Sequence, residues 1–464
     1  MERKNAWESY DKETYVQVFA FAEQYRKFIS RNKTDRECTA EAALMAKEAG
    51  YRDLYGVIEQ GIALKPGDRV YAVNMNKSIA LFEIGTEPIE NGLNILGAHI
   101  DSPRLDLKQD PLYEDAGLAF FNTHYYGGIK KYQWTARPMA LHGVVALKNG
   151  QTVSICIGED ETDPIVGISD LLIHLASKQM QKSGADVVAG EDLNVLVGSI
   201  PSAGDAEEKK EKRQVADNIL SILHTKYGIE EEDFLSAEIE VVPAGPARDY
   251  GIDKSMIAGY GQDDRVCAYP SLIAQLRVRN PRRTTCTLLV DKEEIGSVGA
   301  TGMHSRFFEN TLAELMNAAG QYSDIALRRA LRHSRMLSSD VSAAYDPNYP
   351  DVMEKQNACY FGKGVVFNKY TGARGKSGSN DANAEFLGML RRILDDNNVA
   401  FQTAELGKVD AGGGGTIAYI MAGLDMSVVD SGVAVQNMHA PMEVTSKADI
   451  YEALKCYCAF LENA

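Results

Sequence analysis

The amino-acid sequence predicts an α/β protein that is interrupted by a β-rich insertion. Apolar residues recur at helical spacing near the start of the chain, short apolar strands then alternate with helical stretches, and this pattern stops in the middle of the chain and resumes later. Strands that alternate with helices are typical of a sheet covered by helices. The length of 464 residues suits two or three packed units. We therefore expect one domain made of residues 1–101 and 248–464, with a second domain, residues 102–247, inserted between them.

The first piece is expected to contain two helices followed by three strands. Helical spacing of apolar residues extends over 15–51 and is broken near Asn32. Two β-rich runs, 69–74 and 78–84, flank a short polar turn, and a fully apolar strand follows at 94–98. Polar residues follow the last of these strands directly, and they include candidate functional residues.

The inserted piece has the composition of a β-rich domain. Residues 110–137 are rich in aromatic and turn residues. Two β-rich runs surround Asn149 and Gly150, which both tolerate the positive φ of a type I′ hairpin turn. Helical spacing over 168–182 predicts an amphipathic helix. The charged run at 207–213 has nearly balanced charge, so we expect a solvated loop or helix face there.

The α/β pattern resumes in the last piece of the chain. We expect an apolar strand at 286–290, helices within 312–332 and over 384–394, a strand at 426–429 and a closing helix at 447–461. These elements add strands and helices to the same α/β domain that the first piece begins.

Composition and charge exclude several classes of protein. Asp and Glu (65) outnumber Lys and Arg (49), and the resulting net charge of −16 disfavours binding to a nucleic-acid backbone. No stretch reaches the roughly 20 consecutive apolar residues that a membrane span needs. No secretory signal is recognisable, and the seven cysteines include no CxxC pair. We therefore expect reduced thiols and a cytoplasmic protein.

Charged residues and histidines follow predicted strands, which is where ligands bind in open α/β sheets. His99 and Asp101 come directly after an apolar strand, and Asp101 can accept a hydrogen bond from the His99 ring nitrogen that a metal does not use. Glu293 and Glu294 stand in a run of four charged residues after the strand 286–290. Such a cluster at the end of an apolar strand indicates a nearby cation, and each segment alone also fits a polar surface turn.

Three further segments complete the set of candidate ligands. Asp263 and Asp264 are adjacent carboxylates, which repel one another unless a cation compensates them. Asp340 and His439 lie in polar segments later in the chain, and either alone is a weak signal. The ordered set contains two imidazoles and three carboxylates, the mixture that suits Zn²⁺ or a similar divalent ion: His99, Asp263, Glu294, Asp340 and His439.

These motifs, in this order, resemble the aspartyl aminopeptidase family, which includes the vacuolar aminopeptidase I type and belongs to the co-catalytic zinc exopeptidases. The resemblance spans nearly the whole chain. Its most specific segments are Gly-Ala-His-Ile-Asp-Ser-Pro at 97–103 and Asp-Lys-Glu-Glu-Ile-Gly-Ser at 291–297. The resemblance implies a zinc-exopeptidase-like, three-layer α/β/α catalytic domain with an inserted, β-rich dimerisation domain.

The resemblance also implies how the candidate residues share two Zn²⁺ ions per subunit, for which Co²⁺ or Mn²⁺ could substitute. Asp263 would bridge the two ions. His99 and Asp340 would complete the protein ligands of one ion, and Glu294 and His439 would complete those of the other. The expected function is therefore that of a metal-dependent aminopeptidase that removes N-terminal residues from peptides.

Two more roles follow from the same resemblance. Glu293 would be the general base for a hydroxide held by the two metals, and Asp101 would be the partner of the His99 ring. Two-metal sites of this kind are already known in aminopeptidases as a class. The choice of Asp263 as the bridge over Asp264 follows from aligning the pair with the family's Asp-Asn, in which the first residue is the ligand, and Asp264 stays open as the alternative.

The inserted domain is expected to mediate a homo-oligomer, by resemblance a dodecamer built of dimers. The family places a histidine from this region of one subunit in the active site of its neighbour, and His174 matches that position. The alternative for His174 is an ordinary contact between helices. Peptides are the expected partners, and neither nucleic acid nor a membrane is expected.

Several alternatives remain open at this point. A glutamyl or deblocking two-metal aminopeptidase shares most of the ligands, but its inserted barrel is shorter than the insertion here. A catalytically silent scaffold would not need all five ligands and the base. Arg374 or Lys376, in a basic loop, could hold an acidic substrate side chain or belong to an ordinary loop. The glycine run 412–415 lacks the lysine of a P-loop and indicates a close backbone approach near the active site.

Overall fold

The computed structural model describes residues 4–202 and 213–464, so most of the charged run at 207–213 lies outside the described residues. The chain forms two compact units. Among the described residues, no helix is long and apolar enough to cross a membrane. Unit 1 comprises Met1–Ser102, Ala247–Met438 and Glu443–Ala464, and unit 2 comprises Pro103–Pro246 and His439–Met442.

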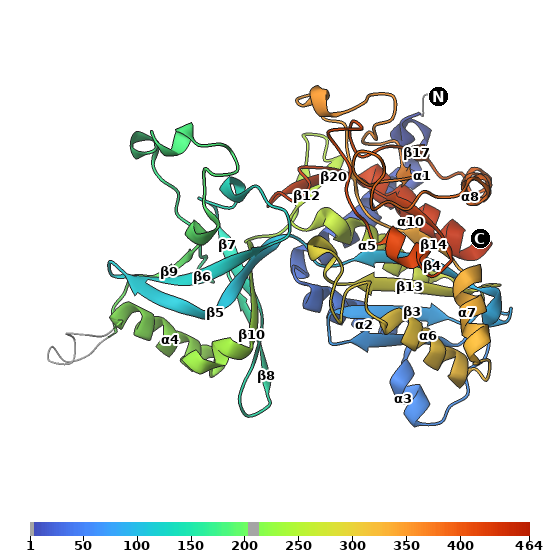
Figure 1. The fold of residues 1–464 in the computed structure, drawn as a ribbon, viewed down its shortest axis with the longest axis horizontal. Helices are drawn as coiled ribbons and strands as arrows, with labels where there is room; N and C mark the ends of the chain where they lie inside the picture. The colour runs from blue at the N-terminus through green and yellow to red at the C-terminus, as the bar shows by residue number, and fades with distance from the viewer. Residues whose placement is uncertain (1–3, 203–212) are drawn as a thin grey trace. The chain divides into compact units, whose positions relative to one another are not determined.

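Unit 1 is built on a nine-stranded sheet with the strand order β1-β2-β3-β13-β4-β14-β18-β16-β17. Figure 1 shows β3, β13, β4 and β14 side by side in this order. β4 lies between β13 and β14 and is parallel to both, whereas β3 pairs with β13 in the antiparallel direction. Every residue of β3, β4 and β13 is buried, as expected for strands covered on both faces. The strands are Arg52–Asp53 (β1), Arg69–Asn74 (β2), Ser78–Glu83 (β3), Leu93–His99 (β4), Thr284–Val290 (β13), Arg335–Ser338 (β14), Val365–Asn368 (β16), Phe401–Thr403 (β17) and Ser427–Gly432 (β18).

Helices cover both faces of this sheet, which confirms the expected three-layer α/β/α arrangement (Figure 1). Two separate apolar clusters fill the two interfaces between helices and sheet. The first cluster contains residues of α1 (Lys12–Arg31), α2 (Asp35–Glu48), α5 (Gln262–Arg277), α8 (Ala384–Asp396) and α10 (Lys447–Asn463). The second contains residues of α3 (Leu54–Glu59), α6 (Phe307–Ala318), α7 (Asp324–His333) and α9 (Ala418–Ala422).

The expected break between the first two helices is confirmed, and it has a local cause. Thr34 begins α2 with a capping box: its hydroxyl accepts a hydrogen bond from the backbone N–H of Glu37 at 3.1 Å, and the Glu37 carboxylate accepts one from the Thr34 N–H at 3.1 Å. The capping box satisfies the N–H groups of Thr34 and Glu37, which favours the start of a new helix at this point.

A second, five-stranded sheet in unit 1 has the strand order β11-β12-β20-β19-β15. It carries residues that lie next to the candidate ligands, because α5 follows β12 and β15 follows Asp340. The strands are Arg248–Tyr250 (β11), Met256–Gly259 (β12), Ser342–Ala343 (β15), Ala434–Gln436 (β19) and Glu443–Ser446 (β20).

Unit 2 is rich in strands, as its composition predicts. Its six-stranded sheet is antiparallel throughout, in the order β8-β7-β10-β5-β6-β9. The hairpin predicted at Asn149 and Gly150 is confirmed, but of this pair only Gly150 has a positive φ (87°), so the turn is not of type I′. The elements are Arg104–Asp115 (β5), Leu118–Tyr126 (β6), Met139–Ala146 (β7), Thr152–Ile157 (β8), Val195–Gly198 (β9), Ala237–Pro243 (β10) and the helix Gln214–Tyr227 (α4).

The amphipathic helix predicted at 168–182 is wrong. The segment contains only two short 3-10 turns, Ile173–Leu175 and Gln179–Gln181. The Asp170 carboxylate accepts a hydrogen bond from the backbone N–H of Leu171 and another from the Gln179 side chain, and such local bonds compete with a helix. The apolar residues that suggested a buried helical face are exposed instead: Leu171, Leu172, Ile173 and Leu175.

Candidate metal centre

The predicted ligands of unit 1 meet at the carboxyl ends of adjacent parallel strands. His99 is the last residue of β4 and is paired with Val290, the last residue of β13. The loop after β13, which carries Glu293 and Glu294, therefore begins beside His99. Asp340 follows β14, which pairs with β4 on its other side. The sheet order thus brings together three segments that lie far apart in the sequence, at the edge where open α/β sheets bind ligands.

Three carboxylate side chains surround the Nε2 atom of His99. Nε2 lies 3.2 Å from Oδ1 of Asp263, 3.9 Å from Oε2 of Glu293 and 3.9 Å from Oδ1 of Asp340. His99, Asp263 and Asp340 offer ligand atoms that all lie within 4.8 Å of one another, and so do His99, Glu293 and Glu294. The structure therefore brings together every predicted ligand of unit 1.

The second nitrogen of the His99 ring faces Asp101. Nδ1 lies 3.3 Å from Oδ1 of Asp101 and 3.1 Å from the carbonyl oxygen of the same residue. Burial lowers the pKa of His99, but hydrogen bonds to Asp101 and Asp263 outweigh it, and the pKa is raised well above the usual value. A proton held on Nδ1 by Asp101 leaves Nε2 directed toward the carboxylates, which is the orientation that a metal-binding histidine needs.

Asp101 also fixes the loop that carries the two glutamates. Its Oδ1 accepts a hydrogen bond from the backbone N–H of Glu293 at 3.1 Å, and its Oδ2 accepts one from the N–H of Glu294 at 3.2 Å. Lys292 precedes them with a φ of 70°, which turns the chain sharply after β13. One buried carboxylate therefore sets the positions of the imidazole and of both glutamates.

The two adjacent aspartates have different surroundings. Asp263 directs Oδ1 at the His99 ring, whereas Oδ2 of Asp264 accepts a hydrogen bond from the backbone N–H of His99 at 3.3 Å. Asp264 is completely buried, and burial raises its pKa well above the usual value. The geometry thus gives Asp263 the place of a ligand and gives Asp264 a contact to the backbone of β4.

Residues that the sequence did not single out hold Asp263 in place. The Ser102 hydroxyl donates to the Asp263 carbonyl at 2.7 Å, and the Glu443 carboxylate accepts a hydrogen bond from the Asp263 N–H at 3.2 Å. Gly261 has a φ of 75°, and a Cβ there would lie 2.2 Å from the Arg265 guanidinium. Ser102 belongs to the motif at 97–103, but its contact to Asp263, like that of Glu443, is identified only by the three-dimensional structure.

The electrostatics of the cluster fit a divalent cation. Burial raises the pKa of Asp340 well above its usual value, and the neighbouring charge of Asp264 raises it further. Carboxylates packed this closely without a cation oppose one another's ionisation, and a bound dication removes that penalty. An imidazole nitrogen with carboxylate oxygens is the donor set of zinc sites, so the residues present fit Zn²⁺.

Two predicted site residues belong to unit 2. Nδ1 of His439 lies 2.8 Å from the carbonyl oxygen of Gly128. His174 is exposed in the turn Ile173–Leu175. Their proposed roles stay predictions.

The two loops noted for their sequence make local contacts within unit 1. Lys376 pairs with Asp381 at 3.2 Å and lies over the Tyr370 ring, 3.6 Å from its centroid. In the glycine run, a Cβ on Gly413 would lie 1.9 Å from the carbonyl oxygen of Gly372, which accords with the expected close backbone approach. Whether Arg374 or Lys376 holds an acidic substrate side chain stays open.

The chain is similar in sequence to a known family of proteins. Residues 28–461 match the family described as aminopeptidase I zinc metalloprotease (M18). A relative named probable M18 family aminopeptidase 1, from Clostridium acetobutylicum, is 59% identical over 462 residues, which covers 100% of this chain and 98% of the relative.

Solved structures show the same similarity. The crystal structure of aminopeptidase I from Clostridium acetobutylicum is 56% identical with a TM-score of 0.93, and the M18 aminopeptidase structure from Thermotoga maritima is 43% identical with a TM-score of 0.94; both matches cover 100% of each chain. The S. cerevisiae mApe1 dodecamer is 19% identical with a TM-score of 0.75, covers 95% of this chain and 96% of that chain, and shows the shared fold alone.

Proposed function

Because the chain belongs to the M18 family of aminopeptidase I zinc metalloproteases and is a zinc-dependent aminopeptidase, we propose that it removes N-terminal residues from peptides at a centre for two Zn²⁺ ions per subunit. The observation that carries this proposal is the convergence of Asp263, Glu293 and Asp340 on the Nε2 atom of His99. Three carboxylate ligands against two dications leave one positive charge, which suits a negatively charged transition state.

In the proposed assignment, Asp263 would bridge the ions, His99 and Asp340 would hold one of them, and Glu294 and His439 would hold the other. The short separations among His99, Asp263 and Asp340 support the first ligand set. For the second set, the contact between Nδ1 of His439 and the Gly128 carbonyl leaves Nε2 for a metal, which supports His439 as a ligand. When bound, zinc lowers the pKa of water to about 7 and polarises the peptide carbonyl.

Glu293 is proposed to move the proton. Its carboxylate is only partly exposed and lies beside the His99 ring, while Asp101 fixes its backbone N–H. In this position Glu293 can take a proton from the attacking water and deliver it to the departing amine. This division of labour explains why the chain has two adjacent glutamates: Glu294 is left to bind metal.

Unit 2 is proposed to assemble the oligomer, which we propose is a dodecamer built of dimers in the cytoplasm. The exposed apolar side chains of Leu172, Ile173 and Leu175 support an interface there, since a soluble surface seldom exposes such a run without a partner. They flank His174, which is proposed to reach the active site of the neighbouring subunit. None of the seven cysteines, all of which the structure describes, forms a disulfide, which fits a reducing compartment.

Kinetics on a panel of aminoacyl reporter substrates tests the proposal. We expect hydrolysis of substrates with a free N-terminal amine, loss of activity with a chelator and recovery with Zn²⁺, Co²⁺ or Mn²⁺. Elemental analysis of the active enzyme should find two divalent ions per chain. Full activity in protein that contains no bound metal would contradict the proposal, and the ranking of acidic against neutral substrates would define the specificity.

A further inference from the structure

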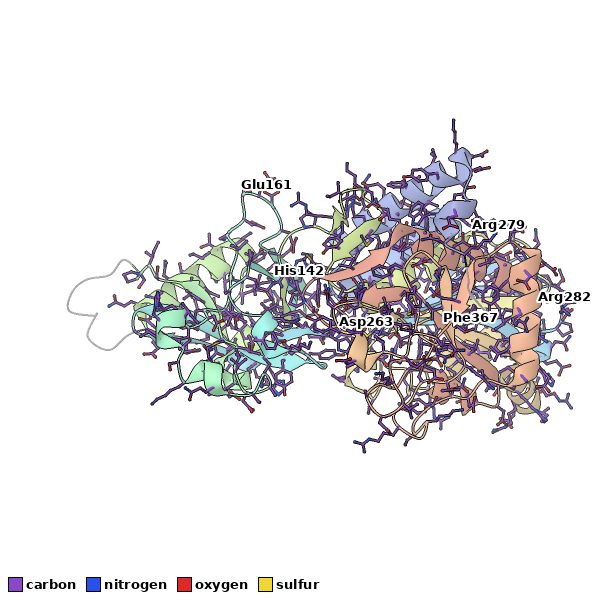
Figure 2. The ribbon with its side chains drawn as sticks, turned by 90° about the horizontal axis from the view of Figure 1, so that it is seen from above. His142, Glu161, Asp263, Arg279, Arg282 and Phe367 are labelled. Atoms are coloured by element: carbon purple, nitrogen blue, oxygen red, sulfur yellow. The ribbon has the colours of Figure 1, made fainter. Side chains whose placement is uncertain are left out.

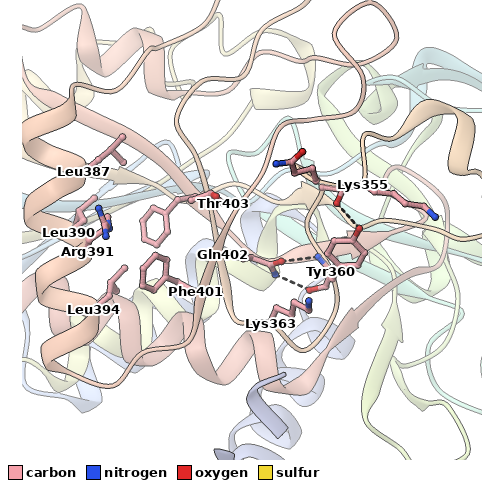
Figure 3. Close-up of a pocket in the computed structure, with 13 residues that line it drawn as sticks. Lys355, Tyr360, Lys363, Leu387, Leu390, Arg391, Leu394, Phe401, Gln402 and Thr403 are labelled. Carbon is pink, nitrogen blue, oxygen red and sulfur yellow. Dashed lines mark hydrogen bonds between the residues drawn. The ribbon is translucent and has the colours of Figure 1, made fainter. Parts of the chain in front are cut away.

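A cavity of about 680 Å³ lies in unit 1 at the end of the nine-stranded sheet, between α8, the strands β16 and β17, and residues 355–363 (Figure 3). None of its lining residues belongs to the candidate metal centre. Its volume falls in the range of roughly 300–1,000 Å³ that is typical of small-molecule sites. The cavity is therefore large enough for a ligand of its own.

The floor of the cavity is apolar and firmly packed. Phe367 of β16, which is labelled in Figure 2, and Phe401 of β17 meet edge to face, with ring centroids 6.1 Å apart. Leu390 and Leu394 of α8 face these rings, and all four side chains are at most 4% exposed. Leu387 extends the apolar wall and is partly exposed. The apolar body of a ligand would therefore contact a floor that is already packed in place before binding.

The opposite wall is held in place by hydrogen bonds. Gln402, in the edge strand β17, accepts a hydrogen bond from the Tyr360 N–H at 2.9 Å and donates one to the Tyr360 carbonyl at 2.8 Å (Figure 3). The Tyr360 hydroxyl donates to the Lys355 carbonyl at 2.8 Å. These contacts tie segment 355–363 to the sheet, so the cavity is preformed and binding costs little ordering entropy.

The charged residues that line the cavity are all cationic. Lys355, Lys363 and Arg391 line it, and none of the described lining residues is Asp or Glu. In the part of the chain that the structure describes, none of these three side chains forms a salt bridge. This local excess of positive charge stands in a protein with a net charge of −16. A concave site lined by one sign of charge attracts ligands of the opposite sign.

From the apolar floor and the cationic rim together, we infer that this cavity binds an amphipathic organic anion, a small molecule with an aliphatic or aromatic body and one acidic head group. The body packs on Phe367, Phe401 and Leu390, and the head group lies beside Arg391, the cationic lining residue on the same helix as Leu390. A cationic or uncharged molecule with the same body lacks the attraction between an acidic head group and the cationic lining.

Isothermal titration of the intact, metal-loaded protein with octanesulfonate, below its micellar concentration, tests the inference. Sulfonate is a poor ligand for zinc, so binding at the metal centre contributes little. We expect one saturable site per chain and at least tenfold weaker binding of octanol and of octylammonium. Equal binding of octylammonium and octanesulfonate, or no saturable binding of octanesulfonate, would overturn the inference.

Neighbouring residues of α8 supply a matched pair of variants. Arg391 lines the cavity, whereas Arg392 is exposed outside it. We expect Arg391→Glu to weaken octanesulfonate binding at least fivefold and Arg392→Glu to change it less than twofold, with Leu387→Asn weakening it through loss of apolar contact. Equal effects of the two arginine variants would reject the site. A change of oligomer size with Arg391→Glu, in protein that binds no octanesulfonate, would instead assign this face to a second copy of the chain.

Discussion

The Asp101 carboxylate accepts a hydrogen bond from the backbone N–H of Glu293 at 3.1 Å, although the two residues are far apart in the sequence. The same carboxylate lies 3.3 Å from Nδ1 of His99. A change at Asp101 therefore acts on the imidazole and on the glutamate loop at once, even though Asp101 is not expected to touch a metal.

We predict that Asp101→Asn lowers zinc affinity or kcat by about 10- to 100-fold, the usual cost of losing a partner of a metal-binding histidine. An asparagine has only one acceptor oxygen, so it cannot serve both glutamate N–H groups and the ring. Zinc titration and steady-state kinetics measure the effect, with the exposed Asp110→Asn as a control. Unchanged zinc affinity and kcat would show that Asp101 does not position the His99 ring or the glutamate loop for function.

The two adjacent glutamates should respond differently to the same substitution. Glu293→Gln is expected to retain its metal and slow turnover by about 10² to 10⁴, because a general base typically contributes that factor. Glu294→Gln is expected to lower metal occupancy instead. Elemental analysis, together with measurement of kcat, distinguishes the two variants. Loss of metal from Glu293→Gln alone would reverse the assigned roles.

His174 tests whether unit 2 contributes to catalysis. If His174 donates to the substrate carbonyl in a neighbouring subunit, His174→Ala should cost about 2.7 to 4 kcal/mol of transition-state stabilisation while the oligomer persists. His224→Ala, at another exposed histidine of unit 2, should leave the rate unchanged.

Mixing inactive subunits gives the sharper result for His174. An oligomer of His174→Ala and Glu293→Gln chains contains some sites with neither defect if the sites are shared between subunits. Activity should then appear in the mixture and be absent from both parents. Verified subunit exchange without recovered activity would reject the shared site.

Asp449 should make the stability of the protein depend on pH. Burial raises its pKa to about 8, although the N–H groups of Gly362 and Gly364 donate to its carboxylate. Because the folded pKa lies above the unfolded value of 3.8, the folded state holds an extra proton between these values, and stability falls as pH rises. The stabilisation is complete below the unfolded pKa and is lost as pH rises through the folded pKa.

Comparison with Asp449→Asn isolates this contribution. Between about pH 5 and 7, the unfolding free energy of the wild type should decline more steeply than that of the variant, by roughly 1.4 kcal/mol per pH unit. Denaturant unfolding of the metal-loaded proteins at a series of pH values measures the two slopes. Parallel slopes would mean that Asp449 is ionised in the folded protein throughout this range.

The sequence predicted much of unit 1 because its local patterns and its packing agree. The apolar strand before Asp291 and the charges after it correspond to the buried β13 and the loop that carries Glu293. The failure at 168–182 has the opposite cause. Apolar spacing predicts a helix only when something covers the apolar face, and in the described chain Ile173 and Leu175 remain exposed. The role of Glu443 beside Asp263 depends on pairing between distant strands, which spacing along the chain does not encode.

The place of β13 in the sheet affects how a ribosome can make this protein. β3 and β4 follow one another in the chain, but β13 lies between them in the sheet, so neither can pair with β13 until residues 100–290 have been synthesised. At the roughly 5–20 residues per second of translation, this delay lasts about 10 to 40 s. Every strand of the unit 2 sheet falls within 104–243 and is complete before then. The nascent chain therefore carries open strand edges of β3 and β4 for this whole interval, which is the period when it most needs protection from aggregation.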